Sequence, residues 1–197
     1  MNTRKWCCIF TLSVGATLLH LVTTAAEAAE DWTKIFAGEV LVEAVENAEG
    51  IPGVRAVFGI SASKERIWAV LLDYDNYPKI FKGVRKTHVL EQAESSAKVE
   101  FWIKAVIVKH HYILDRQYEV PGRRLTWKRI AGDLKRIEGS WEIRDTPRAD
   151  VNLLMYESYV KVGRWIPTRL VRRIAMGKAR DMGKRLRNWI EGRPLED

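Results

Sequence analysis

The chain has 197 residues, of which 47% are hydrophobic, and carries a formal net charge of +8. This length fits one domain with a sizeable core, and the apolar fraction with eight tryptophans excludes a disordered chain. The positive charge favours an anionic partner, and a soluble protein whose solvated faces happen to be basic is the alternative.

Residues 1–28 have the pattern of a signal peptide. Arg4 and Lys5 form a positive start, Cys7–Val22 is mostly apolar and uncharged, and residues 26–28 (Ala-Glu-Ala) fit a cleavage site. A retained anchor is the alternative, although polar residues interrupt the apolar run. Both cysteines lie in this segment, so the mature chain would have none. We therefore predict an exported, periplasmic protein, for which an anionic membrane surface or an acidic partner is favoured over nucleic acid.

Residues 29–53 form an N-terminal extension in which Gly38–Glu43 is an expected added strand. Glu49–Gly53 is a turn cluster, and Val54–Ile60 is the next expected strand. A helix then begins after Ser63, a suitable N-cap residue, and a further helical turn is expected near Pro78.

From Gly83 onward the pattern changes to short runs of alternating polarity separated by turn signals, which predicts antiparallel strands joined by hairpins. The expected strands are Val84–Glu91, Lys98–Ala105, Ile107–Tyr118, Arg124–Ile130, Leu134–Asp145 and Val151–Lys161.

The last long segment, Ile166–Ile190, is predicted to be one amphipathic helix of about 23 residues, or about 35 Å. Pro167 suits its first turn, and Gly192 followed by Pro194 ends it. The whole order predicts an α+β fold in which the helices cover one face of a curved antiparallel sheet.

Several short stretches resemble the START-type, polyketide cyclase/dehydrase domains of the SRPBCC superfamily. The stretches are Ile60–Ser63, Ile67–Pro78, Gly132–Lys135, Gly139–Trp141, Tyr156 and Ile166-Pro167. The resemblance implies a domain over residues 54–191, followed by a tail at 192–197. It also implies a helix-grip fold, in which a curved antiparallel sheet of about seven strands wraps around the C-terminal helix, with two short helices after the first strands. A cavity beneath that helix holds an apolar ligand in such domains, which include lipid carriers, coenzyme Q-binding proteins, polyketide cyclases and hormone receptors.

The alternation of side chains along each strand predicts which of them face the cavity. Odd positions are apolar in Lys98–Ala105, and even positions look inward in Ile107–Tyr118, whereas both parities fit Val151–Lys161. The predicted wall is Phe101, Ile103, Tyr112, Trp127, Ile137, Trp141 and Tyr156. An aromatic wall suits an apolar ligand, and a solidly filled core is the alternative.

Two polar residues share the inward face of the strand Ile107–Tyr118. His110 is a candidate polar anchor, or else a packed or solvent-facing histidine. Arg116 is a candidate for binding an acidic or quinone-like headgroup through its guanidinium fork, or else it pairs with Glu138 or Asp115. His110 and its neighbour in the chain point to opposite faces and do not readily share an ion, so we predict no metal site and no cofactor.

The last helix offers two further sets of candidates. Its basic side is predicted to contact anionic lipid, with a solvated helix face as the alternative. That side comprises Arg169, Arg172, Arg173, Arg180, Lys184 and Arg187. Lys178 and Arg185 fall inside the apolar arc beside Met182, and they either extend past the sheet edge or reach a polar group in the cavity.

No nucleophile elbow, phosphate loop, dinucleotide fingerprint or zinc pattern occurs, and no catalytic residue is assigned. We therefore predict an exported START-like domain that carries an apolar ligand such as a lipid, fatty acid or isoprenoid quinone. The alternatives are a cyclase/aromatase-type enzyme and an assembly factor without a ligand.

Overall fold

The structure is a computed structural model that describes residues 31–105, 108–161 and 168–195. The predicted signal peptide and Pro167 lie outside these residues. Within these residues, eight strands form one antiparallel sheet in the order β1-β2-β8-β7-β6-β5-β4-β3. This is the number of strands expected along the chain, and one more than the roughly seven that the family resemblance implies. The strands are β1 (Leu41–Glu46), β2 (Pro52–Ile60), β3 (Val84–Gln92), β4 (Ser96–Ala105), β5 (Val108–Val120), β6 (Arg124–Gly132), β7 (Arg136–Asp145) and β8 (Asn152–Lys161).

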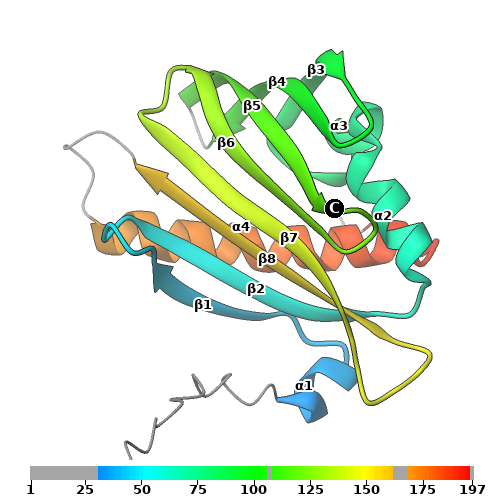
Figure 1. Ribbon diagram of the computed structural model, residues 1–197. Helices are drawn as coiled ribbons and strands as arrows, with labels where there is room; N and C mark the ends of the chain where they lie inside the picture. The colour runs from blue at the N-terminus through cyan, green and yellow to red at the C-terminus, as the bar shows by residue number, and fades with distance from the viewer. Residues whose placement is uncertain (1–30, 106–107, 162–167, 196–197) are drawn as a thin grey trace, which may run out of the picture. The chain divides into compact units, whose positions relative to one another are not determined.

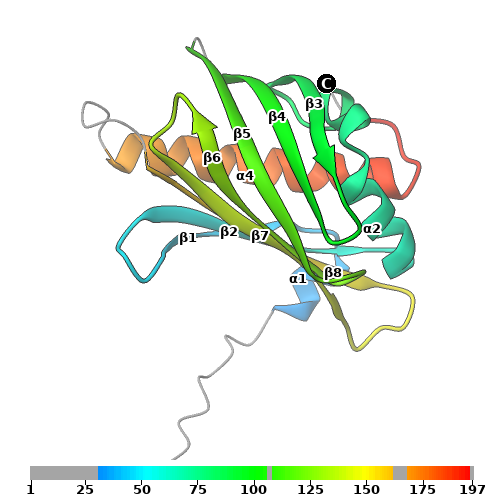
Figure 2. The same cartoon turned by 45° about the horizontal axis from the view of Figure 1, so that its top comes forward.

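The helices are α1 (Trp32–Phe36), α2 (Lys64–Leu72), α3 (Tyr77–Ile80) and α4 (Thr168–Ile190), with a 3-10 turn at Tyr74–Asn76. The hydroxyl of Ser63 accepts the backbone N–H of Arg66, so the predicted N-cap starts α2. Figures 1 and 2 show the sheet curving across α4, with α2 beside the C-terminal end of that helix. The structure confirms the predicted α+β helix-grip layout.

Both faces of the sheet are covered near its β2–β8 pair. Phe58 and Leu154 face the main core, whereas Val57 and Leu153 pack with Ile35 of α1 on the opposite face. Both inward and outward positions of β8 are therefore apolar, which explains why its sequence fits either parity. The helix α1, which the sequence analysis does not predict, closes this second cluster.

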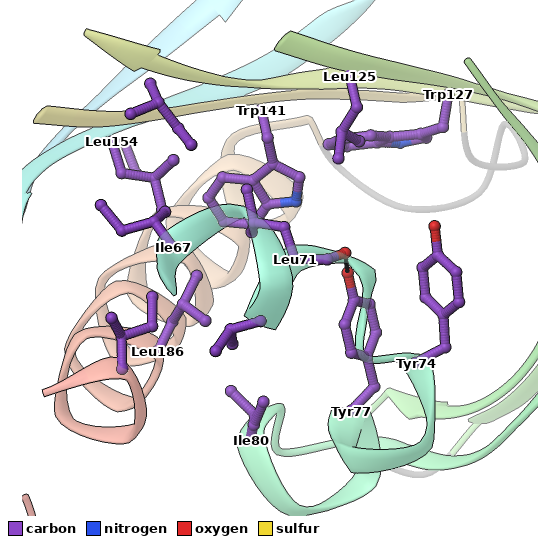
Figure 3. Close-up of a cluster of buried hydrophobic side chains, with 14 of the residues drawn as sticks. Ile67, Leu71, Tyr74, Tyr77, Ile80, Leu125, Trp127, Trp141, Leu154 and Leu186 are labelled. Atoms are coloured by element: carbon purple, nitrogen blue, oxygen red, sulfur yellow. Dashed lines mark hydrogen bonds between the residues drawn. The ribbon is translucent and has the colours of Figure 1, made fainter. Parts of the chain in front are cut away.

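The main core lies between the sheet and the three other helices. Figure 3 shows Leu125, Trp127 and Trp141 on the sheet side of this core. Residues of the helical layer face them from the other side: Ile67, Leu71, Tyr74, Tyr77, Ile80 and Leu186. Burial of these apolar surfaces supplies most of the folding free energy.

The two halves of α4 are buried to different extents. Ala179, Leu186 and Ile190 in the C-terminal half are buried. In the N-terminal half, the described side chains from Arg172 to Lys178 are exposed or only half-buried. The helix therefore packs closely on the sheet at one end and leaves space beneath the other.

Candidate ligand-binding cavity

A cavity of about 370 Å³ lies between α4 and the concave face of the sheet. Its volume falls within the range of sites that hold small molecules. Ten of the twelve predicted ligand-binding residues line it, although their contact with a ligand stays a prediction. They are Phe101, Ile103, Tyr112, Arg116, Trp127, Ile137, Trp141, Tyr156, Lys178 and Met182.

The cavity wall is aromatic because rings from neighbouring strands pack against one another. Tyr156 on β8 stacks with Trp127 at 5.8 Å between ring centroids and contacts Trp141 at 4.6 Å. Phe101 and Tyr112 form a second stack, at 5.6 Å, across β4 and β5. Burial raises the pKa of Tyr112 and of Tyr156, so both hydroxyls stay protonated at neutral pH.

Gly139 makes room for one of these rings. It pairs with Trp127 across β6 and β7, and a Cβ atom there would lie 2.5 Å from the indole. The same atom would also collide with the backbone carbonyl of Glu157. A residue without a side chain is therefore required for Trp127 to lie along the wall.

Among the residues that the structure describes, Arg116 is the one buried charged side chain in the wall, and only 2% of its surface is exposed. Its Nη1 donates to the hydroxyl of Tyr77 at 3.1 Å. The guanidinium carbon lies 4.8 to 5.7 Å from the ring centroids of Tyr74, Tyr77 and Trp127. In the described part of the chain, the Nε and Nη2 atoms of Arg116 are buried without a hydrogen-bond partner.

The predicted alternative for Arg116, an ion pair with Glu138 or Asp115, does not form. Strand parity explains the result: Arg116 points inward, while the Glu138 carboxylate binds Arg136 and that of Asp115 lies 3.9 Å from Lys128. Tyr77 does not neutralise the cation either, because burial raises the pKa of its phenol. Its hydroxyl donates instead to the carbonyl of Leu71 at 2.6 Å, as Figure 3 shows.

The mouth of the cavity carries charged side chains at least partly exposed to solvent, of which only Lys178 is a predicted ligand-binding residue. Lys82, Arg172, Lys178 and Asp181 all line it. The Lys82 ammonium lies 4.0 Å from the Asp181 carboxylate across the gap between the start of β3 and α4. The cavity thus has an aromatic interior and a charged rim.

Two predicted site residues lie outside the cavity wall. His110 is half-buried near the start of β5, opposite Ile103 near the end of β4. Arg185 does face inward, but its Nε donates to the carbonyl of Ile80 and its Nη2 to that of Lys79, both at 2.9 Å. These carbonyls end α3, so Arg185 caps a helix beside the cavity.

Several wall residues escape the sequence analysis. Tyr77 and Phe81 belong to the short helical segment, where strand parity gives no signal. Leu114 alternates in step with Tyr112 on β5, and Val160 with Tyr156 on β8, so strand alternation could have identified both as wall residues. Leu134 lies in the turn before β7, and only the fold brings it to the cavity.

The predicted membrane-contact residues differ in their surroundings. Arg173, Arg180 and Lys184 are exposed and lie on one stripe of α4, and among the residues that the structure describes none of them forms an ion pair. Arg172 approaches Glu46 at 3.4 Å, and Arg187 donates to the carbonyl of Gly38 at 2.6 Å. Arg169 lies in α4, but its side chain is outside the described set. Within that set, no helix is long and apolar enough to cross a membrane.

Comparisons with solved structures place this fold among START domains. A START superfamily protein from Mycobacterium smegmatis aligns with a TM-score of 0.63 and 19% identity, over 71% of this chain and 97% of that chain. A STAR-related lipid transfer protein from Xanthomonas axonopodis gives 0.60 and 17%, over 77% and 93%. An aromatase/cyclase from a Streptomyces species gives 0.55 and 15%, over 77% and 93%.

At these identities the likeness establishes the fold alone. A search of curated protein sequences gives no significant match. The sequence model of the family described as polyketide cyclase / dehydrase and lipid transport matches residues 60–187. The match spans α2, the sheet from β3 to β8 and nearly all of α4. The chain belongs to the polyketide cyclase/dehydrase and lipid transport family.

Proposed function

We propose that this protein is a carrier that shelters an apolar ligand, such as a lipid, fatty acid or isoprenoid quinone, under α4. The observation that carries the proposal is the cavity of about 370 Å³ with its aromatic wall. Burying the apolar surface of a ligand there would contribute about 25 cal/mol per Å², before the cost of ordering the ligand. A solidly packed assembly factor would not keep such a space.

The carrier is proposed to be exported to the periplasm and to work at an anionic membrane surface. The support for export is the pattern of residues 1–28. The support for membrane contact is the exposed stripe of Arg173, Arg180 and Lys184, since each cation near an anionic surface contributes about 1 kcal/mol.

A cyclase-type enzyme is the other function that the family offers. General acid–base catalysis needs a group that titrates near neutral pH. The tyrosines of the wall have raised pKa values, and the described carboxylate that lines the cavity, Asp181, lies at its mouth beside Lys82. The geometry therefore favours a carrier.

Native mass spectrometry of the protein, purified from the compartment to which it is exported, tests the carrier proposal. We expect a stoichiometric small molecule that organic extraction releases. The variant Ala175→Phe places a ring at the cavity mouth and should reduce the occupancy several-fold. Ile174→Phe, on the neighbouring exposed position, is the matched control and should leave it unchanged. A wild-type protein that repeatedly carries no small molecule would refute the proposal.

Flotation with liposomes tests membrane contact separately. The triple variant Arg173→Gln, Arg180→Gln, Lys184→Gln should lose at least tenfold of its binding to anionic liposomes at low salt. The control replaces three cations that pair with carboxylates elsewhere: Lys98→Gln, Arg123→Gln, Lys128→Gln. Equal losses in the two variants would mean that only net charge matters, and the α4 stripe would have no role.

A further inference from the structure

The geometry points to a carboxylic acid with an apolar body as the ligand, and to Arg116 as the residue that binds its carboxylate. This inference rests on the proposed carrier function and adds the chemical class of the ligand. Its starting point is the guanidinium edge of Arg116, which is buried and without a partner among the described residues.

The two unpartnered atoms of Arg116 are the ones that suit a carboxylate. Nε and Nη2 present their N–H groups on the same edge of the guanidinium, and this edge can donate two parallel hydrogen bonds to the two oxygens of a carboxylate. The third nitrogen, Nη1, already donates to the hydroxyl of Tyr77 at 3.1 Å. Within the described residues, Nη1 is thus hydrogen-bonded, while Nε and Nη2, the pair of donors that fits a carboxylate, have no partner.

The surroundings of Arg116 attract its charge without neutralising it. The rings of Tyr74, Tyr77 and Trp127 contribute cation–π attraction but accept no ordinary hydrogen bond from the buried edge. Burial raises the pKa of Tyr74 and of Tyr77, so neither supplies a negative charge at neutral pH. A buried cation without a counter-charge is unfavourable, and a bound carboxylate would supply both the charge and the acceptors.

The position of Arg116 also suits an amphipathic acid. It is the last residue along β5 that lines the cavity, and Tyr112 lies four residues, or about 13 Å, nearer the mouth on the same face. Leu114 lies between them, and Trp127 and Tyr156 come from the neighbouring strands. A carboxylate at Arg116 would leave the apolar body of the ligand against this wall.

Calorimetric titration of the delipidated protein with decanoate and decan-1-ol tests the inference, because the two probes share their chain and differ in the headgroup. We expect wild-type protein to bind decanoate at least tenfold more tightly than the alcohol, as a charge-assisted hydrogen-bond pair implies. Arg116→Met should bring the two affinities to within about twofold. Arg55→Met removes an arginine on the outer face of the sheet, where it pairs with Glu43 and Glu157, and should keep the preference.

A second measurement does not depend on any variant. Decanoate labelled with ¹³C at its carboxyl carbon should stay ionised to lower pH when bound than when free, because the adjacent guanidinium favours the charged form. A carboxyl signal that titrates at the same pH in the complex and in solution contradicts the inference. Arg116→Lys, which keeps the charge but loses the fork, should retain only part of the preference for the acid.

The outcomes separate this inference from the carrier proposal. Equal wild-type affinity for the acid and the alcohol overturns the carboxylate site and leaves the carrier intact. Failure of both probes to bind, together with no co-purified small molecule, overturns the carrier. A preference that disappears in Lys178→Met but persists in Arg116→Met would place the carboxylate at the mouth and refute the role of Arg116.

Discussion

Two glycines of α4 provide a direct test of how this helix packs on the sheet. A Cβ atom at Gly183 would lie 2.8 Å from Val40 and 3.1 Å from Phe58, whereas one at Gly177 would meet nothing within 4 Å. Glycine-to-alanine substitution changes helix propensity in the same way at both positions, so the difference in stability between the two variants reports the packing at Gly183. Gly177→Ala serves as the matched control for Gly183→Ala.

The magnitudes follow from these distances. Alanine in place of glycine inside a helix stabilises it by about 0.5 to 1 kcal/mol, and Gly177→Ala should show this gain. At Gly183 the methyl group must displace Val40 or the buried ring of Phe58, and overpacking of this kind costs about 1 to 3 kcal/mol. Gly183→Ala should therefore be less stable than Gly177→Ala by about 1 to 3 kcal/mol.

Urea unfolding monitored by circular dichroism measures both free energies of unfolding in one experiment. If the free energy of unfolding falls with urea concentration at the same slope in both variants, their unfolded states are comparable. If the two variants were equally stable to within about 0.5 kcal/mol, the close approach of α4 to β2 at Gly183 would be wrong.

Three further predictions concern the site and its supports. Gly139→Ala forces Trp127 to move, and calorimetry should show several-fold weaker binding of decanoate. Arg185→Met leaves two carbonyls of α3 without their donor and should lower the free energy of unfolding by about 1 to 2 kcal/mol, whereas the exposed neighbour Lys184→Met should change it by less than about 0.5. Burial of Glu142 opposes its charged form, but hydrogen bonds and charges from Arg144 and Arg124 outweigh this and hold its pKa below the ordinary 4.5. The stability that the Glu142 carboxylate contributes is therefore present above pH 4.5 and lost as the pH falls through its lowered pKa. The stability difference between wild type and Glu142→Gln should therefore shrink between neutral pH and about pH 3 in urea unfolding.

Much of the fold follows from the sequence because hairpin turns and alternation define the strands locally. The strands from Val84 onward appear within a few residues of their expected bounds. The exception at the N-terminus has a physical reason: α1 has only five residues, too few for a helical period, and β1 begins three residues later than expected. The packing of α1 against Val57 and Leu153 depends on contacts between residues far apart in the sequence, which local patterns do not show.

The site shows the limits of the same reasoning. Parity along β5 places Tyr112 and Arg116 at the cavity, but it says nothing of where the cavity ends, so His110 falls outside it. The helical period correctly turns Arg185 inward, yet only the tertiary structure shows that the carbonyls of α3 are its acceptors. The sequence likewise offers Glu138 and Asp115 as partners of Arg116 because it does not show that they lie on the other face of the sheet.

The unequal halves of α4 indicate where a ligand passes. Opening the C-terminal half would break the contact at Gly183 and both hydrogen bonds of Arg185. Toward the mouth, the ion pairs of α4 that the structure describes are Arg172–Glu46 at 3.4 Å and Lys82–Asp181 at 4.0 Å. Both join solvent-accessible groups, and each such pair contributes at most about 1 kcal/mol. Movement of the N-terminal half therefore costs less free energy. Under the carrier proposal, we expect the ligand to pass between Lys82 and Lys178 and its carboxylate to travel from this cationic rim to Arg116.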